Sequence, residues 1–209
     1  MSFILNIETA TKNCSVSVAK DGQTIACNEL ADEGYSHAEK LHVFIEEVIA
    51  KAGITVQDIN AIAVSQGPGS YTGLRIGVSA AKGLCYALNI PLIAVDTLQT
   101  LASQAEVSDG RIVPMLDARR MEVYSAVFNP DLSIERSIKA EVIDENSFQE
   151  YKEKIYFVGD CADKCKPVLT AENFVFLEQV KYPSAKAMSK ISFEKYQKSD
   201  TVDVAYFEP

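Results

Sequence analysis

The sequence predicts an α/β protein of two lobes, each with a mixed sheet flanked by helices. Short β-rich apolar runs alternate with two longer segments whose apolar residues recur at helical spacing, and this periodicity stops near residues 103–110. The chain has 209 residues, of which 47% are hydrophobic. That length and composition suit one large domain or two small lobes with cores of their own.

The first half of the chain begins with a strand and a hairpin. β-rich runs at Phe3–Glu8 and Cys14–Ala19 are followed by a turn at Asp21-Gly22 and a third run at Thr24–Glu29. Helical and strand patterns then alternate, with a helix, a strand, a helix and a strand at His37–Lys51, Ile59–Ser65, Thr72–Leu88 and Pro91–Val95. The predicted order is therefore β-β-β-α-β-α-β.

The second half of the chain also opens with strands. The predicted elements are strands at Ile112–Leu116, Val123–Phe128, Ile138–Ile143 and Tyr156–Val158 and a closing helix from Ser184 to about Lys198. We place the lobe boundary at the break in periodicity, which gives an N-terminal lobe of residues 1–104 and a C-terminal lobe of residues 105–209. This order of elements is the layout of the actin-like ATPase (ASKHA) fold.

Composition excludes several classes of protein. Acidic residues outnumber basic ones by 29 to 20, and the formal net charge of −9 disfavours direct binding to nucleic acid, which depends on Lys and Arg. The N-terminus lacks the pattern of a secretion signal, and no stretch approaches the ~18 apolar residues of a membrane span. The five cysteines show no pairing pattern and read as structural thiols. We expect a cytoplasmic protein without membrane contact.

The strongest local pattern is the glycine-rich segment at residues 66–77, between a predicted strand and a predicted helix. Glycines let a backbone approach a ligand, and a helix N-terminus offers free N–H groups, so the segment could hold an anion or phosphate. Its candidate residues are Gly67, Gly69, Ser70, Thr72, Gly73 and Arg75. A tight strand-to-helix turn explains the same glycines equally well. The segment lacks the lysine of a Walker loop, which argues against a P-loop NTPase.

Read as a string, GPGSYTGLRIG at Gly67–Gly77 resembles the signature of the TsaB/YeaZ family. Other stretches resemble that family in the same order along the chain: ILNIETATKNCSVSV, SHAEKLHVFIEEVIAKAG, LDARRMEVYSAVF and, more weakly, VGDCA. Relatives typically continue through a short tail beyond Pro209, and the sequence leaves open whether the chain is truncated there.

The resemblance implies an actin-like fold and no catalysis by this chain. It implies a non-catalytic subunit that binds and activates a TsaD-like enzyme, which with a TsaE-like ATPase transfers a threonylcarbamoyl group to adenosine 37 of tRNA. ATP and metal are then expected at the partner subunits, with no cofactor on this chain. The tRNA would be bound only through the complex, and the chain could form a homodimer when alone.

The alternative is an actin-like ATPase or kinase acting on its own. Such enzymes carry a phosphate loop of the Asp-x-Gly-Thr type in the first hairpin, where this chain has Glu8, Thr9, Ala10 and Thr11. Glu8 replaces the aspartate, and the glycine is missing, so a side chain crowds the place where a phosphate would approach the backbone. Hydroxyls that satisfy a turn are the favoured interpretation.

Other candidate sites are weaker. His37 and His42 are five residues apart, about 140° around a helix, so they cannot easily chelate one metal ion, and we expect no metal site. Asp117, Arg119 and Arg120 could form a polar catalytic cluster, but a turn with a solvated or salt-bridged arginine pair is the favoured interpretation.

The two predicted helices of the first lobe provide a candidate partner interface. The candidates are the apolar residues Leu41, Val43, Phe44, Ile45 and Val48 and the small residues Gly73, Gly77 and Ala81. The apolar stripe of the first helix is wider than one core face needs, so Val43 and Phe44 are expected to face outward, while Ile76, Leu84 and Leu88 of the second helix are expected in the core. In the resembled family this helix pair joins the matching pair of TsaD in a four-helix bundle. The alternative is that all these residues are buried within the lobe.

Overall fold

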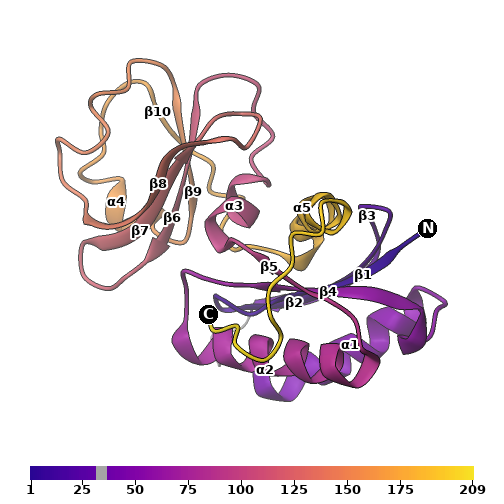
Figure 1. Cartoon of the computed structure of the whole chain (residues 1–209). Helices are drawn as coiled ribbons and strands as arrows, with labels where there is room; N and C mark the ends of the chain where they lie inside the picture. The colour runs from indigo at the N-terminus through magenta and orange to yellow at the C-terminus, as the bar shows by residue number, and fades with distance from the viewer. Residues whose placement is uncertain (32–36) are drawn as a thin grey trace. The chain divides into compact units, whose positions relative to one another are not determined.

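The computed structural model describes residues 1–31 and 37–209, and the chain divides into two compact units (Figure 1). The first unit comprises Met1–Thr100 and Ser184–Pro209, and the second comprises Leu101–Pro183. The chain passes from the first unit to the second within the short helix α3 (Thr97–Ala102).

The first unit is built on a five-stranded sheet in the order β3-β2-β1-β4-β5. Its strands are β1 (Phe3–Glu8), β2 (Asn13–Lys20), β3 (Gln23–Ala31), β4 (Ile59–Ser65) and β5 (Leu92–Val95). The first three strands pair antiparallel, whereas β1, β4 and β5 run parallel. The carboxyl ends of the three parallel strands therefore meet at one edge of the sheet.

Helices cover both faces of this sheet (Figure 1). On one face, α1 (His37–Lys51) and α2 (Tyr71–Leu88) lie beside each other over Leu5 and Ile7. On the other face, α5 (Ala185–Gln197) packs on Ile4 and Ile93. Because both faces are buried, β1 and β4 are apolar at most positions. The 3-10 helix η1 (Val56–Asp58) leads into β4.

The second unit contains a five-stranded sheet in the order β10-β9-β6-β7-β8. Its elements are β6 (Arg111–Asp117), β7 (Glu122–Phe128), β8 (Ile134–Val142), β9 (Ile155–Gly159), α4 (Ala162–Cys165) and β10 (Phe174–Phe176). Phe157 anchors its core, with ring centroids 5.5 Å from Phe148, 5.2 Å from Phe174 and 4.9 Å from Phe176. Such close aromatic packing stabilises a small core.

The two sheets repeat one topology. Read from the hairpin edge, their orders are β3-β2-β1-β4-β5 and β8-β7-β6-β9-β10. In each, three antiparallel strands are followed by two strands parallel to the first one. This duplicated mixed sheet with flanking helices is the actin-like ATPase fold, as the order of elements in the sequence predicted.

Most predicted elements are present, and β1, α1 and β4 have the predicted bounds. The short α3 and β10 were not predicted, because six and three residues carry too little periodicity. The division into residues 1–104 and 105–209 differs from the structure at the C-terminus. Helix α5 belongs to the first unit, where its apolar side packs on the sheet and Ser17 Oγ donates a hydrogen bond to the Ala185 carbonyl oxygen at 2.8 Å.

Candidate functional site

The turn after β1 is where an actin-like ATPase would bind phosphate, and here its polar groups bond to one another. Glu8, Thr9 and Thr11 are all buried. The Ala10 N–H donates to Glu8 Oε1 at 2.6 Å, and the Thr11 hydroxyl accepts a bond from the Asn13 N–H at 3.3 Å. The backbone donor that a phosphate would need at Ala10 is therefore already used.

The glycine-rich segment packs directly on this turn. An ideal Cβ built at Gly69 would lie closer than 3.0 Å to the Ala10 carbonyl oxygen, and at Gly73 or Gly77 it would lie equally close to oxygens of Thr9. Real Cβ atoms do not approach oxygens so closely. These three glycines are thus explained by contact with the chain itself, which is the structural alternative that the sequence left open.

Hydrogen bonds also occupy the N-terminus of α2. The Ser70 N–H donates to the Ala10 carbonyl oxygen at 2.6 Å, and the Thr9 hydroxyl donates to the Gly73 carbonyl oxygen at 2.8 Å. Ser70 Oγ caps the helix by accepting from the Gly73 N–H at 3.3 Å. The N–H groups of Ala10, Ser70 and Gly73 are therefore bonded within the chain, and none of these three is left for a phosphate group.

The remaining residues predicted for this loop lie apart from the turn. Gly67 has a φ of +102°, which glycine adopts readily, and its carbonyl oxygen accepts a bond from the Thr97 N–H at 3.0 Å. Thr72 and Arg75 are exposed on α2, and the Arg75 guanidinium lies 4.1 Å from the centre of the Tyr71 ring.

Glu8 is the main electrostatic feature of the region. Burial raises the pKa of its carboxyl to about 7, and the Ala10 N–H only partly offsets this effect. Among the described residues, Glu8 Oε2, Ser65 Oγ and Thr97 Oγ1 are buried without a hydrogen-bond partner of good geometry. The three residues lie at or just after the carboxyl ends of β1, β4 and β5, so buried polar atoms gather at this edge of the sheet.

The histidines serve different purposes. His37 is buried, and its Nε2 lies 2.7 Å from the Thr11 carbonyl oxygen, so this nitrogen must carry the proton and the ring fixes the turn to α1. Burial lowers the pKa of His37. His42 is exposed on the same helix. Within residues 1–31 and 37–209, no three His, Cys, Asp or Glu side chains gather closely enough to hold a metal ion.

The predicted partner interface is mostly buried inside the first unit. Six of its eight residues face the sheet and contribute to the core or to the turn: Leu41, Ile45, Val48, Gly73, Gly77 and Ala81. They are not available to a partner, so the prediction was wrong for them. The helices do lie side by side as expected, but the small residues of α2 allow close contact with Thr9 rather than with another helix.

Val43 and Phe44 occupy different positions on α1. Val43 is 46% exposed, as expected, whereas Phe44 is half-buried and packs against the core. At about 100° per residue, Val43 lies about 100° around the helix from His42, and it does not line the groove with that residue. The outward-facing expectation therefore holds for Val43 alone.

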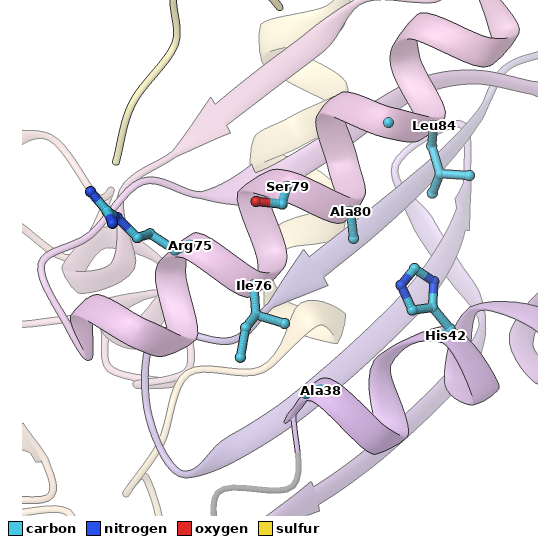
Figure 2. A pocket seen from close by; sticks show the side chains of 8 residues that line it. Ala38, His42, Arg75, Ile76, Ser79, Ala80 and Leu84 are labelled. Carbon is cyan, nitrogen blue, oxygen red and sulfur yellow. The ribbon is translucent and has the colours of Figure 1, made fainter.

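An open groove with a volume of about 600 Å³ runs between the two helices (Figure 2). Ala38 and His42 line it from α1, and Ile76, Ala80 and Leu84 line it from α2 (Figure 2). Ile76 and Leu84 were expected in the core but are only partly buried, because the sheet-facing side of α2 carries Leu74, Val78, Ala81 and Cys85 instead. The sequence analysis missed this groove, whose signal was the combination of small and apolar residues on the outer side of α2.

The polar cluster predicted in the second unit is a turn between β6 and β7. Arg119 and Arg120 are exposed and have φ angles of +75° and +48°. Asp117 pairs with Lys164 of α4 rather than with either arginine. The arginines are therefore solvated, as favoured, and the salt bridge of the turn comes from a residue that the sequence did not single out.

None of the helices among the described residues has the length and apolar character that a membrane crossing requires.

The fold and the turn together define an actin-like protein whose first phosphate turn is filled by its own glycine-rich loop. A family model described as "TsaD: tRNA N6-adenosine threonylcarbamoyltransferase" matches residues 31–198. The tRNA threonylcarbamoyladenosine biosynthesis protein TsaB of Escherichia coli K12 is 33% identical, over 99% of this chain and 92% of its own length. The chain therefore belongs to the TsaB/YeaZ family.

Solved structures agree on the fold. YeaZ from Pseudomonas aeruginosa superposes with a TM-score of 0.86 at 24% identity, covering 100% of this chain and 99% of that one. A more distant neighbour, component A of (R)-2-hydroxyglutaryl-CoA dehydratase from Acidaminococcus fermentans, has a TM-score of 0.53 at 10% identity and covers 94% of this chain and 98% of that one.

Proposed function

We propose that this chain is a non-catalytic subunit that binds and activates a TsaD-like enzyme in threonylcarbamoyl transfer to adenosine 37 of tRNA. One observation carries the proposal: loop and turn fill the phosphate position in the first unit, while the adjacent helix pair leaves an open groove. Membership of the TsaB/YeaZ family supports it.

The division of labour follows from the same contacts. ATP and metal would reside on the TsaD-like subunit and on a TsaE-like ATPase, because this chain uses the Ala10 and Ser70 N–H groups for itself. With a net charge of −9, the chain would meet tRNA only through the complex, in the cytoplasm. Alone at physiological salt, its dissociation constant for tRNA should be weaker than about 10 μM.

The docking surface is the groove between α1 and α2, with its exposed and half-buried apolar lining. Because the family model described as TsaD spans both helices, a TsaD-like partner should possess the corresponding helix pair. Two related subunits can then pack around an approximate two-fold axis, as homodimers do. When the partner is absent, a second copy of this chain could occupy the same groove.

Reconstitution with the TsaD-like and TsaE-like proteins of the same organism tests the function. Mass spectrometry of the tRNA should show the modified adenosine only when all three proteins are present. The chain alone should hydrolyse no ATP. Robust ATP turnover by the pure chain, lost in Glu8→Ala, would establish the ATPase alternative instead.

Ser79→Arg tests the surface, because Ser79 is exposed and lines the groove. The new side chain should fill the groove and weaken binding to the TsaD-like protein more than tenfold in calorimetry. Ala50→Arg is the matched control, since Ala50 is exposed on α1 outside the groove. Equal binding by the two variants, with both folded by circular dichroism, would place the interface elsewhere.

A further inference from the structure

Three buried oxygen atoms at the carboxyl edge of the first sheet need hydrogen-bond partners: Glu8 Oε2, Ser65 Oγ and Thr97 Oγ1. All three residues are completely buried, and none of these atoms has a partner of good geometry among the described residues. Folded proteins rarely leave buried polar atoms unbonded, because each has given up its bonds to solvent without a replacement. Three such atoms in one region therefore indicate a bound molecule that supplies their partners.

The strands bring these atoms within reach of a single small molecule. β1, β4 and β5 are parallel neighbours, and the register of the first two places Glu8 level with Ser65. Side chains at the same level of neighbouring parallel strands point to one face, about 4.8 Å apart. Thr97 follows β5 closely, and its N–H donates to the Gly67 carbonyl oxygen at 3.0 Å, which keeps it beside the chain that leaves β4. Two hydrogen bonds of about 2.8 Å to one oxygen atom span about 5.6 Å, enough to join neighbouring strands.

The groups around these atoms decide what kind of molecule fits. Asp96 lies close enough to raise the pKa of Glu8, so two carboxyl groups would repel an anion. A Mg²⁺ or Ca²⁺ ion takes about six or more oxygen ligands. The described residues offer three unbonded buried oxygens here, because Glu8 Oε1 already accepts from the Ala10 N–H and Asp96 Oδ1 from the Gln99 N–H. A buried water molecule makes about three hydrogen bonds, which matches this number.

We propose that one ordered water molecule is an integral part of this fold, hydrogen-bonded to the Glu8 carboxyl group and to the hydroxyl groups of Ser65 and Thr97. The water donates to Glu8 Oε2 when the carboxyl is ionised and accepts from it when the carboxyl is protonated, so one molecule serves both states. It joins the ends of β1 and β4 to the first residue of α3. The inference concerns this chain alone and is independent of the proposed function.

A high-resolution crystal structure of the chain is the direct test. It should show one water molecule within hydrogen-bond distance of all three oxygen atoms. The competing arrangement is a direct bond between Glu8 and Ser65, since the Ser65 hydroxyl lies close enough to lower the pKa of the Glu8 carboxyl. Such a direct bond, with no water between the two side chains, would overturn the proposal.

Removal of either hydroxyl gives a second test, because the two possibilities predict effects of opposite sign on the Tm. The measurements are made at pH 6, where Glu8, with a pKa of about 7, is mainly protonated in the folded protein. If the water is bound, Ser65→Ala and Thr97→Val each lose a hydrogen bond and should lower the Tm by about 3 °C. A hydroxyl without a partner destabilises the folded state, so an unchanged or raised Tm in these variants would contradict the proposal.

The double variant shows whether one molecule joins the two hydroxyls. Its loss in Tm should be clearly smaller than the sum of the two single losses, because the second substitution acts on a water that the first has already weakened. Thr100→Val is the matched control in the same helix, since Thr100 Oγ1 donates directly to the Asp96 carbonyl oxygen at 2.9 Å. Its loss should add to that of Ser65→Ala. Additive losses for Ser65→Ala and Thr97→Val would show that no shared water joins them.

Discussion

The turn after β1 in the first unit corresponds to the turn after β6 in the second unit, but different contacts hold the two turns in place. In each, the first strand of the sheet ends in an acidic residue, Glu8 in β1 and Asp117 in β6. In each, that carboxylate accepts a bond from the N–H two residues later, from Ala10 at 2.6 Å and from Arg119 at 3.0 Å. The topology and the local hydrogen bond are therefore shared.

What covers the turns differs. In the first unit, glycines bring the backbone of α2 into contact with Thr9, and Glu8 is completely buried. In the second unit, Lys164 reaches the turn from α4, pairing with Asp117 and donating to the carbonyl oxygens of Arg120 at 2.9 Å and Glu122 at 2.7 Å. The turn in the first unit is therefore held by close packing against glycines, which have no side chain, and the turn in the second unit is held by the charged side chain of Lys164. We expect steric changes to damage the first turn most and charge changes to have smaller effects in the second.

Gly73→Val should have the largest effect. Its Cβ would clash with the Thr9 carbonyl oxygen, and this backbone atom cannot rotate away. We expect a loss of about 4 kcal/mol in the free energy of unfolding, above the usual overpacking cost of about 1–3 kcal/mol. Urea unfolding measures it, with Gly83→Val as the matched control in the same helix, since no described atom lies near that position. Similar losses for both variants would show that helix propensity, not contact with the turn, dominates.

Glu8→Gln should change the pH dependence of stability by the next largest amount. The pKa of Glu8 is raised from 4.5 to about 7, so its protonated form is favoured by folding. Its contribution is complete below about pH 4.5 and is lost as the pH rises through about 7. The difference of 7 − 4.5 = 2.5 units corresponds to about 3 kcal/mol.

The free energy of unfolding of wild type and of Glu8→Gln, measured between pH 4 and pH 8.5, isolates the contribution of Glu8. The contributions of the other carboxylates cancel in the difference between the two proteins. The variant should gain stability relative to wild type as the pH rises. A difference that stays constant across this range would mean that folding does not shift the pKa of Glu8.

The layout of the fold was predictable from the sequence because its main strands are apolar on both faces and its long helices have a clear period. The position of the last helix was not. The periodicity of α5 shows that one side is buried, but not which sheet covers it, and its pairing with β1 and β2 depends on contacts such as Ser17 with Ala185, far apart in the chain.

The candidate site was predictable only in part, and the glycines explain why. The pattern at residues 67–77 indicated close backbone approach, but the sequence does not say whether a ligand, a partner or the chain itself approaches. The structure assigns Gly69, Gly73 and Gly77 to internal contacts, while Gly83 has none among the described residues. The interface prediction failed at Leu41 and Val48 for a similar reason. The apolar residues of a helix do not show which of them the sheet will cover until the position of the sheet is known.

Lys164→Met should cost about 1–2 kcal/mol in the second unit. The substitution keeps most of the apolar stem but removes donors to two carbonyl oxygens and one carboxylate, and Lys164 is 22% exposed. Arg119 and Arg120 have positive φ angles in this turn, so the turn should become more mobile without the bonds from Lys164. Amide hydrogen exchange should rise at residues 117–122 and remain unchanged at residues 8–13. Faster exchange in both turns would contradict the conclusion that the two turns are held by independent contacts.

The smallest effect should come from Asp117→Asn, although Asp117 corresponds to Glu8 in the repeated topology. Its side chain is 53% exposed, so its pairing with Lys164 is weakened by solvent and salt. An asparagine can still accept the bond from the Arg119 N–H. We expect a loss of about 0.5 kcal/mol, and a double-mutant cycle with Lys164→Met should give a coupling below about 1 kcal/mol that shrinks further in 1 M salt. A coupling of several kcal/mol would mean that the second turn is closed as tightly as the first, and the contrast between steric and charged closure would then be wrong.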